Sequence, residues 1–536
     1  MGADLKRLTE VPKVSRRRGA LRDAGIGGST PYVAADTGID TMSGFLPSSR
    51  AVDAEILPGR DRITARGRDL GRNNGWAAGA INKEVDGVIG ANFRPLLKPD
   101  WRALGLSAEW AQAFKETIEA RWRTYATDPR MLCDTTRGQT MPQMLGMAYR
   151  TYMIEGEAIG LVNWRSRRPF KTTLRVVDPD LLCNPDGGAD EERLRGGVEI
   201  TRDGVARAYH FRQGHPATTW ANTSDAMTWK RIAREAASGR PQVIHFYDKL
   251  RDGQTRGVSR MAPIIERLRM EDHYSRVELQ AAVINAVLAA FIKSPMGPEA
   301  ISEMFGDDGD MNSLLNYQAG RSSYYSGTGG LKIGGARIQA LYPNDEIGMV
   351  PTARPAAQFA DFEAAVLRHI ASGMGISYEQ LASDWSKTNY SSARAAMIEI
   401  WRGWTARRTA FAQGFCQPFF MAWLEEQVMD GHVQLPRGAP DFYAYWPAYA
   451  RAKWIGPGKG FVDPVKEAQA AAMRVSLGLS TAEEEAAELT GTDYAENMEQ
   501  IAREIANMPD GMLHPAQESF AKLIGQNGGP VLTPEG

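Results

Sequence analysis

The sequence lacks the features that mark secreted and membrane proteins. Its 536 residues include three cysteines, none spaced as in a CxxC pair, so we predict neither a disulfide framework nor a zinc site. Such sparse use of cysteine is typical of a reducing cytoplasm. The longest apolar-rich run, residues 279–292, is too short to span a bilayer, and the basic N-terminus is not followed by the apolar stretch of a secretory signal. We therefore expect no contact with a membrane.

Motifs of catalysis and metal binding are missing too. The seven histidines are scattered, and neither HExxH nor GxSxG occurs. Residues 456–460, GPGKG, lack the GxxxxGK[ST] spacing of a phosphate-binding loop. Residues 308–319 begin like a calcium loop but lack the Gly and Glu required at its sixth and twelfth positions. Glu155 and Glu157 can share a strand face in water as easily as in a site. We predict no enzyme activity, no catalytic residue, no metal site and no cofactor.

Charge of one sign does not dominate the whole chain, but it does dominate parts of it. The formal net charge is -1, whereas a protein that binds nucleic acid tightly usually has a basic excess. Residues 1–22 carry a net charge of +5, and residues 464–507 carry -6. This asymmetry suits an assembly whose two ends meet different partners. A disordered tail and a solvated pair of helices would explain it equally well.

The chain does have the apolar content of a folded protein, with 43% hydrophobic residues in a length that suits roughly three or four domains. Residues 1–60 show little periodicity and predict an extended arm. Helices are expected within residues 61–90, after a cap at Ser107, and from about Thr140. Short β-prone runs follow at residues 158–164, 173–177, 197–200, 206–212 and 242–247. These patterns predict an α+β domain.

The second half is dominated by helical patterns. We expect a helix over residues 261–292, capped by Ser259, whose C-terminal half is apolar on nearly every side and therefore enclosed by neighbours. An irregular insert with short strands precedes a second helix at residues 356–374. A loop then leads into a long aromatic helix from Ser391 to about residue 430, which Pro418 should kink. The acidic residues 464–508 predict a final pair of helices.

Three stretches of this sequence resemble the lambda-type portal family of tailed bacteriophages. They are RGRDLGRNNGWAAGAINKEVDGVIG at residues 66–90, VIHFYDKLRDGQTRGVSR at 243–260, and LRHIASGMGISYEQLASDWSKTNYSSARAA at 367–396, the most specific of the three. The arm and the C-terminal tail match the family poorly. The residues that carry the family motifs are Arg72, Asn73, Asn74, Gly257, Ser259, Tyr378, Asp384, Ser391, Ser392 and Arg394.

The resemblance implies an α+β portal fold with an α/β wing, a two-helix stem, a small β-containing clip and a helical crown. The implied parts are an N-terminal arm (1–60), the first part of the wing (61–258), stem helix 1 (259–294), the clip (295–352), stem helix 2 (353–374), a tunnel loop (375–392), the second part of the wing (393–463), the crown (464–510) and a C-terminal tail (511–536).

The function implied by the resemblance is that of a portal. Such subunits form a ring, usually of twelve, at the unique capsid vertex through which terminase packages double-stranded DNA and from which the genome is later ejected. The expected partners are the terminase large subunit, the major capsid protein and a head–tail connector or adaptor. The expected location is the virion, with assembly in the host cytoplasm. A second hypothesis is a sequence-independent DNA-binding or head-completion adaptor protein; a terminase-like ATPase is disfavoured because no phosphate-binding loop is present.

The tunnel loop supplies the candidate functional residues. We expect Trp385, Lys387, Asn389 and Tyr390 at or next to the narrowest point of the channel. Lys387 is the only basic residue between His369 and Arg394, so a ring would display one circle of charge that meets phosphates without reading bases. Ser391 or Ser392 is expected to cap the following helix. Alternatively, Trp385 and Tyr390 are packing anchors and Lys387 is a solvated loop charge.

Overall fold

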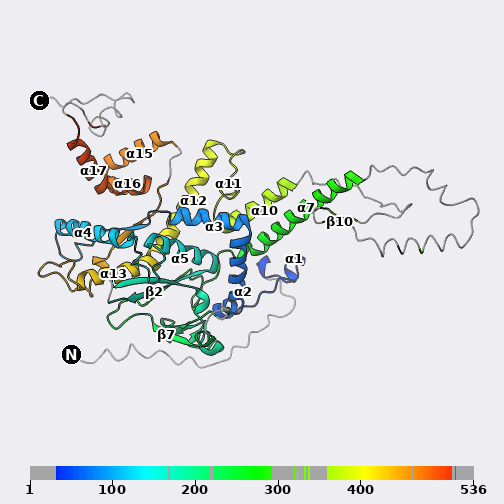
Figure 1. Cartoon of the computed structure of the whole chain (residues 1–536), viewed down its shortest axis with the longest axis horizontal. Helices are drawn as coiled ribbons and strands as arrows, with labels where there is room; N and C mark the ends of the chain where they lie inside the picture. Colours follow the sequence, from blue (N-terminus) through cyan, green and yellow to red (C-terminus); the bar gives the residue numbers. More distant parts are fainter. Residues whose placement is uncertain are drawn as a thin grey trace, which may run out of the picture. The chain divides into compact units, whose positions relative to one another are not determined.

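We describe the protein from a computed structural model of the whole chain (Figure 1). The residues described are 32–166, 169–215, 217, 223–291, 359–459, 463–509 and 514, together with 319, 323, 331–333 and 336–338. The chain divides into two compact units, residues 1–51 and 52–536. Within the first unit, the short elements η1 (Val33–Ala35) and α1 (Asp40–Ser43) are described. The following paragraphs concern the second unit.

Helices open the second unit and begin earlier than expected. Helix α2 (Val52–Asn73) starts before residue 60, so the predicted boundary of the extended arm was too late. The acidic side chains of Asp53 and Glu55 in its first turn interact favourably with the positive end of the helix dipole. Helices α3 (Gly75–Val88), α4 (Ala108–Ala126) and α5 (Met141–Glu155) follow. Ser107 caps α4 as predicted, because its side chain accepts a hydrogen bond from the Trp110 N–H at 3.2 Å.

Small antiparallel sheets lie beside these helices. The order β3-β2-β8 joins β3 (Thr172–Val177), β2 (Glu157–Trp164) and β8 (Val243–Tyr247). The order β4-β5-β6-β7 joins β4 (Leu194–Arg195), β5 (Val198–Ile200), β6 (Ala206–Arg212) and β7 (Trp229–Ala233). All five expected strands are confirmed, and the predicted mixture of helices and sheets is confirmed with them. The pair formed by β1 (Arg94–Leu97) and β11 (Ala452–Ile455) was missed.

The predicted stem helices pack against each other, as Figure 1 shows for α7 and α10. Ser259 accepts a hydrogen bond from the Met261 N–H, but a 3-10 turn, η4 (Ala262–Ile264), comes before α7 (Ile265–Phe291). The expected helical start at residue 261 is corrected accordingly. Tyr274 of α7 stacks on Phe359 of α10 (Phe359–Met374), with ring centroids 5.6 Å apart. Residue 292 and residues 353–358 lie outside the described residues.

Of the insert expected to be the clip, little is described. Strands β9 (Leu331–Ile333) and β10 (Ala336–Ile338) pair antiparallel, with Lys332 opposite Arg337. Most of residues 295–352, including the aspartate-rich segment 307–312, lies outside the described residues.

The long aromatic helix is interrupted before its proline. Helix α12 (Tyr390–Phe411) runs into a π-helical turn, η5 (Ala412–Cys416), and α13 (Gln417–Met429) follows. Pro418 lies in the first turn of α13, where its missing N–H costs little. The break we expected at Pro418 is therefore a π-turn that precedes it. Trp423 of α13 packs edge-on against Trp122 of α4, with centroids 4.9 Å apart, in the main core.

The acidic C-terminal segment forms three helices instead of the expected two: α15 (Pro464–Ser476), α16 (Ala482–Leu489) and α17 (Tyr494–Ala506). Asp463, Thr481 and Asp493 cap them through their side chains. We refer to these helices as the crown helices. In the ranges described above, no helix is both long and apolar enough to cross a membrane.

Candidate channel segment and its supporting ionic networks

The candidate channel segment, residues 375–392, is held at its middle by helix α3. It contains the short helix α11 (Tyr378–Ala382), which ends at Ser383 in a left-handed conformation with φ of 54°. The Lys83 ammonium of α3 donates to the Ser383 hydroxyl at 2.7 Å and also to the Gln380 carbonyl. Burial lowers the pKa of Lys83 from its ordinary value. The segment therefore includes a short helix fixed against α3 by one cation.

The four predicted tunnel residues differ in their surroundings. Trp385 is 39% exposed and Lys387 is exposed. Asn389 caps α12, because its side-chain oxygen accepts the Ser392 N–H at 2.8 Å. The expectation that Ser391 or Ser392 caps this helix is thus wrong, since both lie inside its first turn. Tyr390 is the first residue of α12, and its side chain lies outside the described part of the structure.

A buried glutamate of α3 connects the start of this segment to neighbouring helices. Arg407 of α12 donates to the Gly375 carbonyl at 3.3 Å, and its guanidinium lies 2.8 Å from the carboxylate of Glu84. Glu84, in α3, is fully buried and accepts a hydrogen bond from the Tyr149 hydroxyl at 2.9 Å. Arg260, just before η4, lies 3.7 Å from the same carboxylate. One carboxylate thus connects α3, α5, α12 and the approach to α7.

A second buried carboxylate, Glu157 at the start of β2, forms the centre of a larger network. It pairs with Arg60 of α2 at 2.6 Å and accepts bonds from Arg256 and from the Gly257 N–H, both at 3.0 Å. His245 of β8 lies 3.0 Å away. Burial raises the pKa of Glu157, but the charges of Arg256 and Arg60 outweigh it and hold that pKa well below its ordinary value. We name Glu157, Arg60, Arg256, Gly257 and His245 the Glu157 network.

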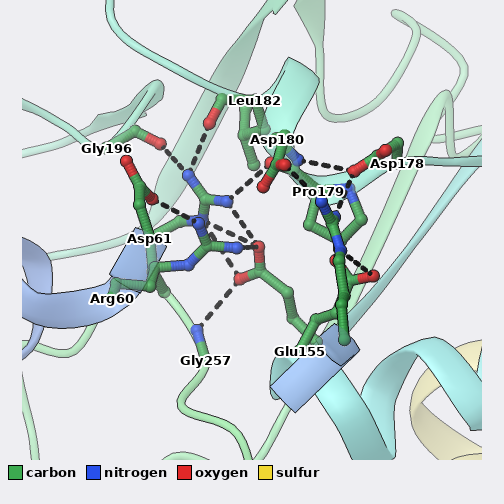
Figure 2. A network of polar contacts seen from close by, with 12 residues as sticks. Arg60, Asp61, Glu155, Asp178, Pro179, Asp180, Leu182, Gly196 and Gly257 are labelled. Atoms are coloured by element: carbon green, nitrogen blue, oxygen red, sulfur yellow. Dashed lines mark hydrogen bonds and ion pairs between the residues drawn. The ribbon is translucent and has the colours of Figure 1, made fainter. Parts of the chain in front are cut away.

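Other N–H groups of Arg256 donate to backbone carbonyls. Figure 2 shows the carbonyl groups of Leu182 and Gly196 directed at a guanidinium, and Arg256 donates to them at 2.6 and 2.5 Å. A Cβ on Gly257 would lie 2.1 Å from the Gly156 carbonyl oxygen, so only glycine fits there. The family motif RGVS is thus explained by packing: Arg256 and Gly257 contact the sheet, and Ser259 accepts the Met261 N–H just before the 3-10 turn η4.

The remaining motif residues have structural positions. Asn74 caps α3 by accepting the Ala77 N–H at 2.9 Å, and Asn73 donates to Asp69 at 2.7 Å, while Arg72 in the last turn of α2 is exposed. The guanidinium of Arg368 lies over the ring of Tyr378 at 5.1 Å. Asp384 accepts the Ser386 N–H at 3.0 Å, and its hydrogen bonds to Ser386 lower the pKa of Asp384. Arg394 is exposed on α12.

The one group of His and acidic residues in the described ranges that could hold a metal is already engaged. It consists of Asp178, Asp180 and His215. The guanidinium of Arg68 contacts both aspartates and also Glu155, at 2.7 Å from Asp178 (Figure 2). A cation would compete with this arginine, so the cluster fits an ion-pair role.

Sequence reasoning did not identify the centres of the two networks, Glu84 and Glu157. It noted only that Glu155 and Glu157 could share a strand face in water as easily as in a site, whereas both are buried and paired with arginines. A usable signal was present in the family stretch at 243–260, where a histidine and an arginine precede the stem helix. The partner carboxylate lies about a hundred residues earlier in sequence and could not be assigned to them.

Comparisons with known proteins place this chain in a family. Residues 39–408 match the family described as "Phage portal protein, lambda family". The portal protein of Escherichia phage N15 is 34% identical over 469 residues, covering 86% of this chain and 87% of that protein. Portal protein B of Escherichia phage lambda is 34% identical over 464 residues, covering 85% and 86%. The neck of an empty GTA particle is 13% identical, with a TM-score of 0.40, over 79% of this chain and 92% of that one.

The family model and the matched relatives define a class of structural proteins, the phage portal proteins. This chain belongs to the lambda family of phage portal proteins. The resemblance of the three sequence stretches, and the portal function that it implied, are confirmed.

Proposed function

We propose that this chain forms the ring at the unique capsid vertex through which terminase packages the genome and from which the genome leaves. The observation that carries the proposal is the family match over residues 39–408, which includes both stem helices and the channel segment. We expect a ring of usually twelve subunits, and the family match gives no reason to expect enzyme activity or a cofactor.

The positions of residues in the channel segment support the proposal that double-stranded DNA passes through the ring. Both of its ends are fixed, by Arg407 at Gly375 and by the cap of α12 at Asn389, and Lys387 between them is exposed. A ring would repeat this one cation once per subunit. Such a circle attracts phosphates of any sequence, and few contacts per subunit keep the binding weak enough for movement.

The partners and location follow from the same proposal. The ring would contact the terminase large subunit during packaging, the major capsid protein around the vertex, and a head–tail connector or adaptor afterwards. It would be part of the virion after assembly in the host cytoplasm.

The test is the native mass of the purified full-length chain, together with electron microscopy of single particles. A closed ring of about a dozen copies with a central opening is the expected result. A monomer that binds DNA of any sequence would instead favour the sequence-independent DNA-binding or head-completion adaptor.

A further inference from the structure

A groove between α12 and the crown helix α15 has no function assigned above. Its volume is about 390 Å³, and α12 contributes Arg394, Ile398, Trp401 and Arg402 to its lining. The opposite wall includes Lys466 and Arg474 of α15. We refer to it as the α12–α15 groove.

The charges of this groove are strongly biased. Five basic side chains line it and a single acidic one, Glu467. Arg474 is paired with Glu485 at 2.6 Å, and Lys466 with Asp463 at 3.0 Å. In contrast, no ion pair within the described residues involves Arg394 or Arg402. The α12 wall therefore offers two exposed arginines to an acidic partner.

The floor of the groove is apolar and firmly positioned. Trp401 has the guanidinium of Arg408 over its ring at 5.0 Å and Trp404 against it at 6.2 Å. Ile398 beside it is 47% exposed. An apolar floor between arginines suits an amphipathic protein segment, because a phosphate backbone has no apolar face to bury there.

The crown helix α17 has the matching character. Tyr494, Met498, Ile501 and Ile505 follow helical spacing on one face, yet no residue of α17 is buried. Met498 is 45% exposed. Next to it, the Glu499 side chain is 74% exposed and has only a 3.9 Å contact with Arg503. The helix thus presents an apolar stripe bordered by acid.

The groove and α17 lie at different places on the same unit. Glu496 ties α17 to Arg123 of α4, while the groove lies against α12. Figure 1 shows α15 and α16 between α17 and α12, so a subunit cannot fill its own groove with its own α17. Two different complementary surfaces at separate places on one subunit are what a heterologous, ring-closing contact requires.

We propose that α17 of a second copy of this chain binds in the α12–α15 groove, with Met498 against Ile398 and Trp401, and Glu499 facing Arg394 and Arg402. This inference rests on the proposed ring and names one of its subunit contacts.

Disulfide cross-linking of the full-length chain tests the contact. The double variant Ile398→Cys with Met498→Cys should, on mild oxidation, give a ladder of covalent oligomers that extends to the full ring. Each single variant should stay monomeric on a denaturing gel, since neither surface meets its own copy. The wild-type chain supplies the baseline for its native cysteines, of which Cys133 and Cys416 are buried and Cys183 is partly buried. Cross-linking by Met498→Cys alone would show that α17 meets α17 and would overturn the proposal.

Charge reversal provides the second measurement. Arg394→Glu with Arg402→Glu should abolish the ring peak in native mass spectrometry, and adding Glu499→Arg should restore it. The reversal Arg202→Glu, at an exposed arginine in the β5–β6 turn, should leave the ring intact. If the wild type forms rings but neither ladder nor rescue occurs, this inference fails and the proposed function stands. If the wild type forms no ring, the proposed function fails first. Loss of DNA binding by the reversed arginines with rings intact would assign the groove to DNA.

Discussion

At the scale of single residues, Glu157 is the buried acid on which the largest network depends. Its carboxylate compensates two buried arginines at once, Arg60 and Arg256. Breaking a buried ion pair from one side is costly because the remaining charges stay buried without a partner.

We therefore expect Glu157→Gln to lower the free energy of unfolding by about 3–5 kcal/mol at pH 7, measured with urea. Because the folded protein holds the pKa of Glu157 well below 4.5, the wild type should lose this stabilisation as the pH falls below that value. Glu192→Gln is a matched control at an exposed site and should change stability by less than about 0.5 kcal/mol. Equal effects of the two variants would contradict the role of the network.

Glu119 of α4 titrates in the opposite sense. Burial raises its pKa from 4.5 to about 7, although the Leu97 N–H donates to it at 2.6 Å. Its contribution to stability is complete below pH 4.5 and is lost as the pH rises towards 7. The free energy of unfolding of Glu119→Gln relative to the wild type should rise by about 1 kcal/mol or more from pH 5 to pH 8, measured by urea unfolding at both values. A difference that does not change with pH would refute this assignment.

At the scale of elements, α3 lies close to α12 at one glycine. A Cβ on Gly87 would lie 2.4 Å from the Trp404 ring, whereas one on Gly79 of the same helix would meet nothing within 4 Å. Gly87→Ala should therefore cost about 1–3 kcal/mol by overpacking. Gly79→Ala should be neutral or stabilise by up to about 1 kcal/mol, since alanine favours helix. Thermal unfolding of the pair is the measurement, and a Gly87→Ala variant as stable as Gly79→Ala would show that Trp404 moves aside.

The cap of α12 gives a second prediction about an element. Asn389→Ala removes the acceptor of the Ser392 N–H and should cost about 1 kcal/mol of local stability, visible as faster hydrogen exchange in the first turn. Ser391→Ala should leave that exchange unchanged. The reverse result would restore the serine cap that the sequence suggested.

The sequence predicted elements well where local patterns decide them. The cap at Ser107 and the strand at residues 206–212 are correct because they depend on neighbouring residues. The strand pair β1–β11 was missed because its partners are over 350 residues apart. The channel segment was placed by family resemblance, but its anchors Lys83 and Arg407 depend on tertiary contacts that no local pattern indicates.

At the scale of the whole molecule, a ring would repeat the positive charge of Lys387 once per subunit. We expect Lys387→Ala to leave the ring mass unchanged and to alter the length or retention of packaged DNA, measured by gel analysis of DNA from assembled particles. Lys249→Ala, at another exposed lysine, serves as the control and should package normally. Normal packaging by Lys387→Ala would identify Lys387 as a solvated loop charge.

The Glu157 network also has a mechanical consequence. Arg256 donates to three backbone carbonyls and one carboxylate just ahead of helix α7, and Gly257 is pressed against Gly156. A load pulling on α7 would have to break these bonds together, because they share one short segment. Bonds loaded in parallel resist far more force than bonds opened one after another. Helix α7 should therefore transmit torque to the sheet as a rigid lever and not as a hinge.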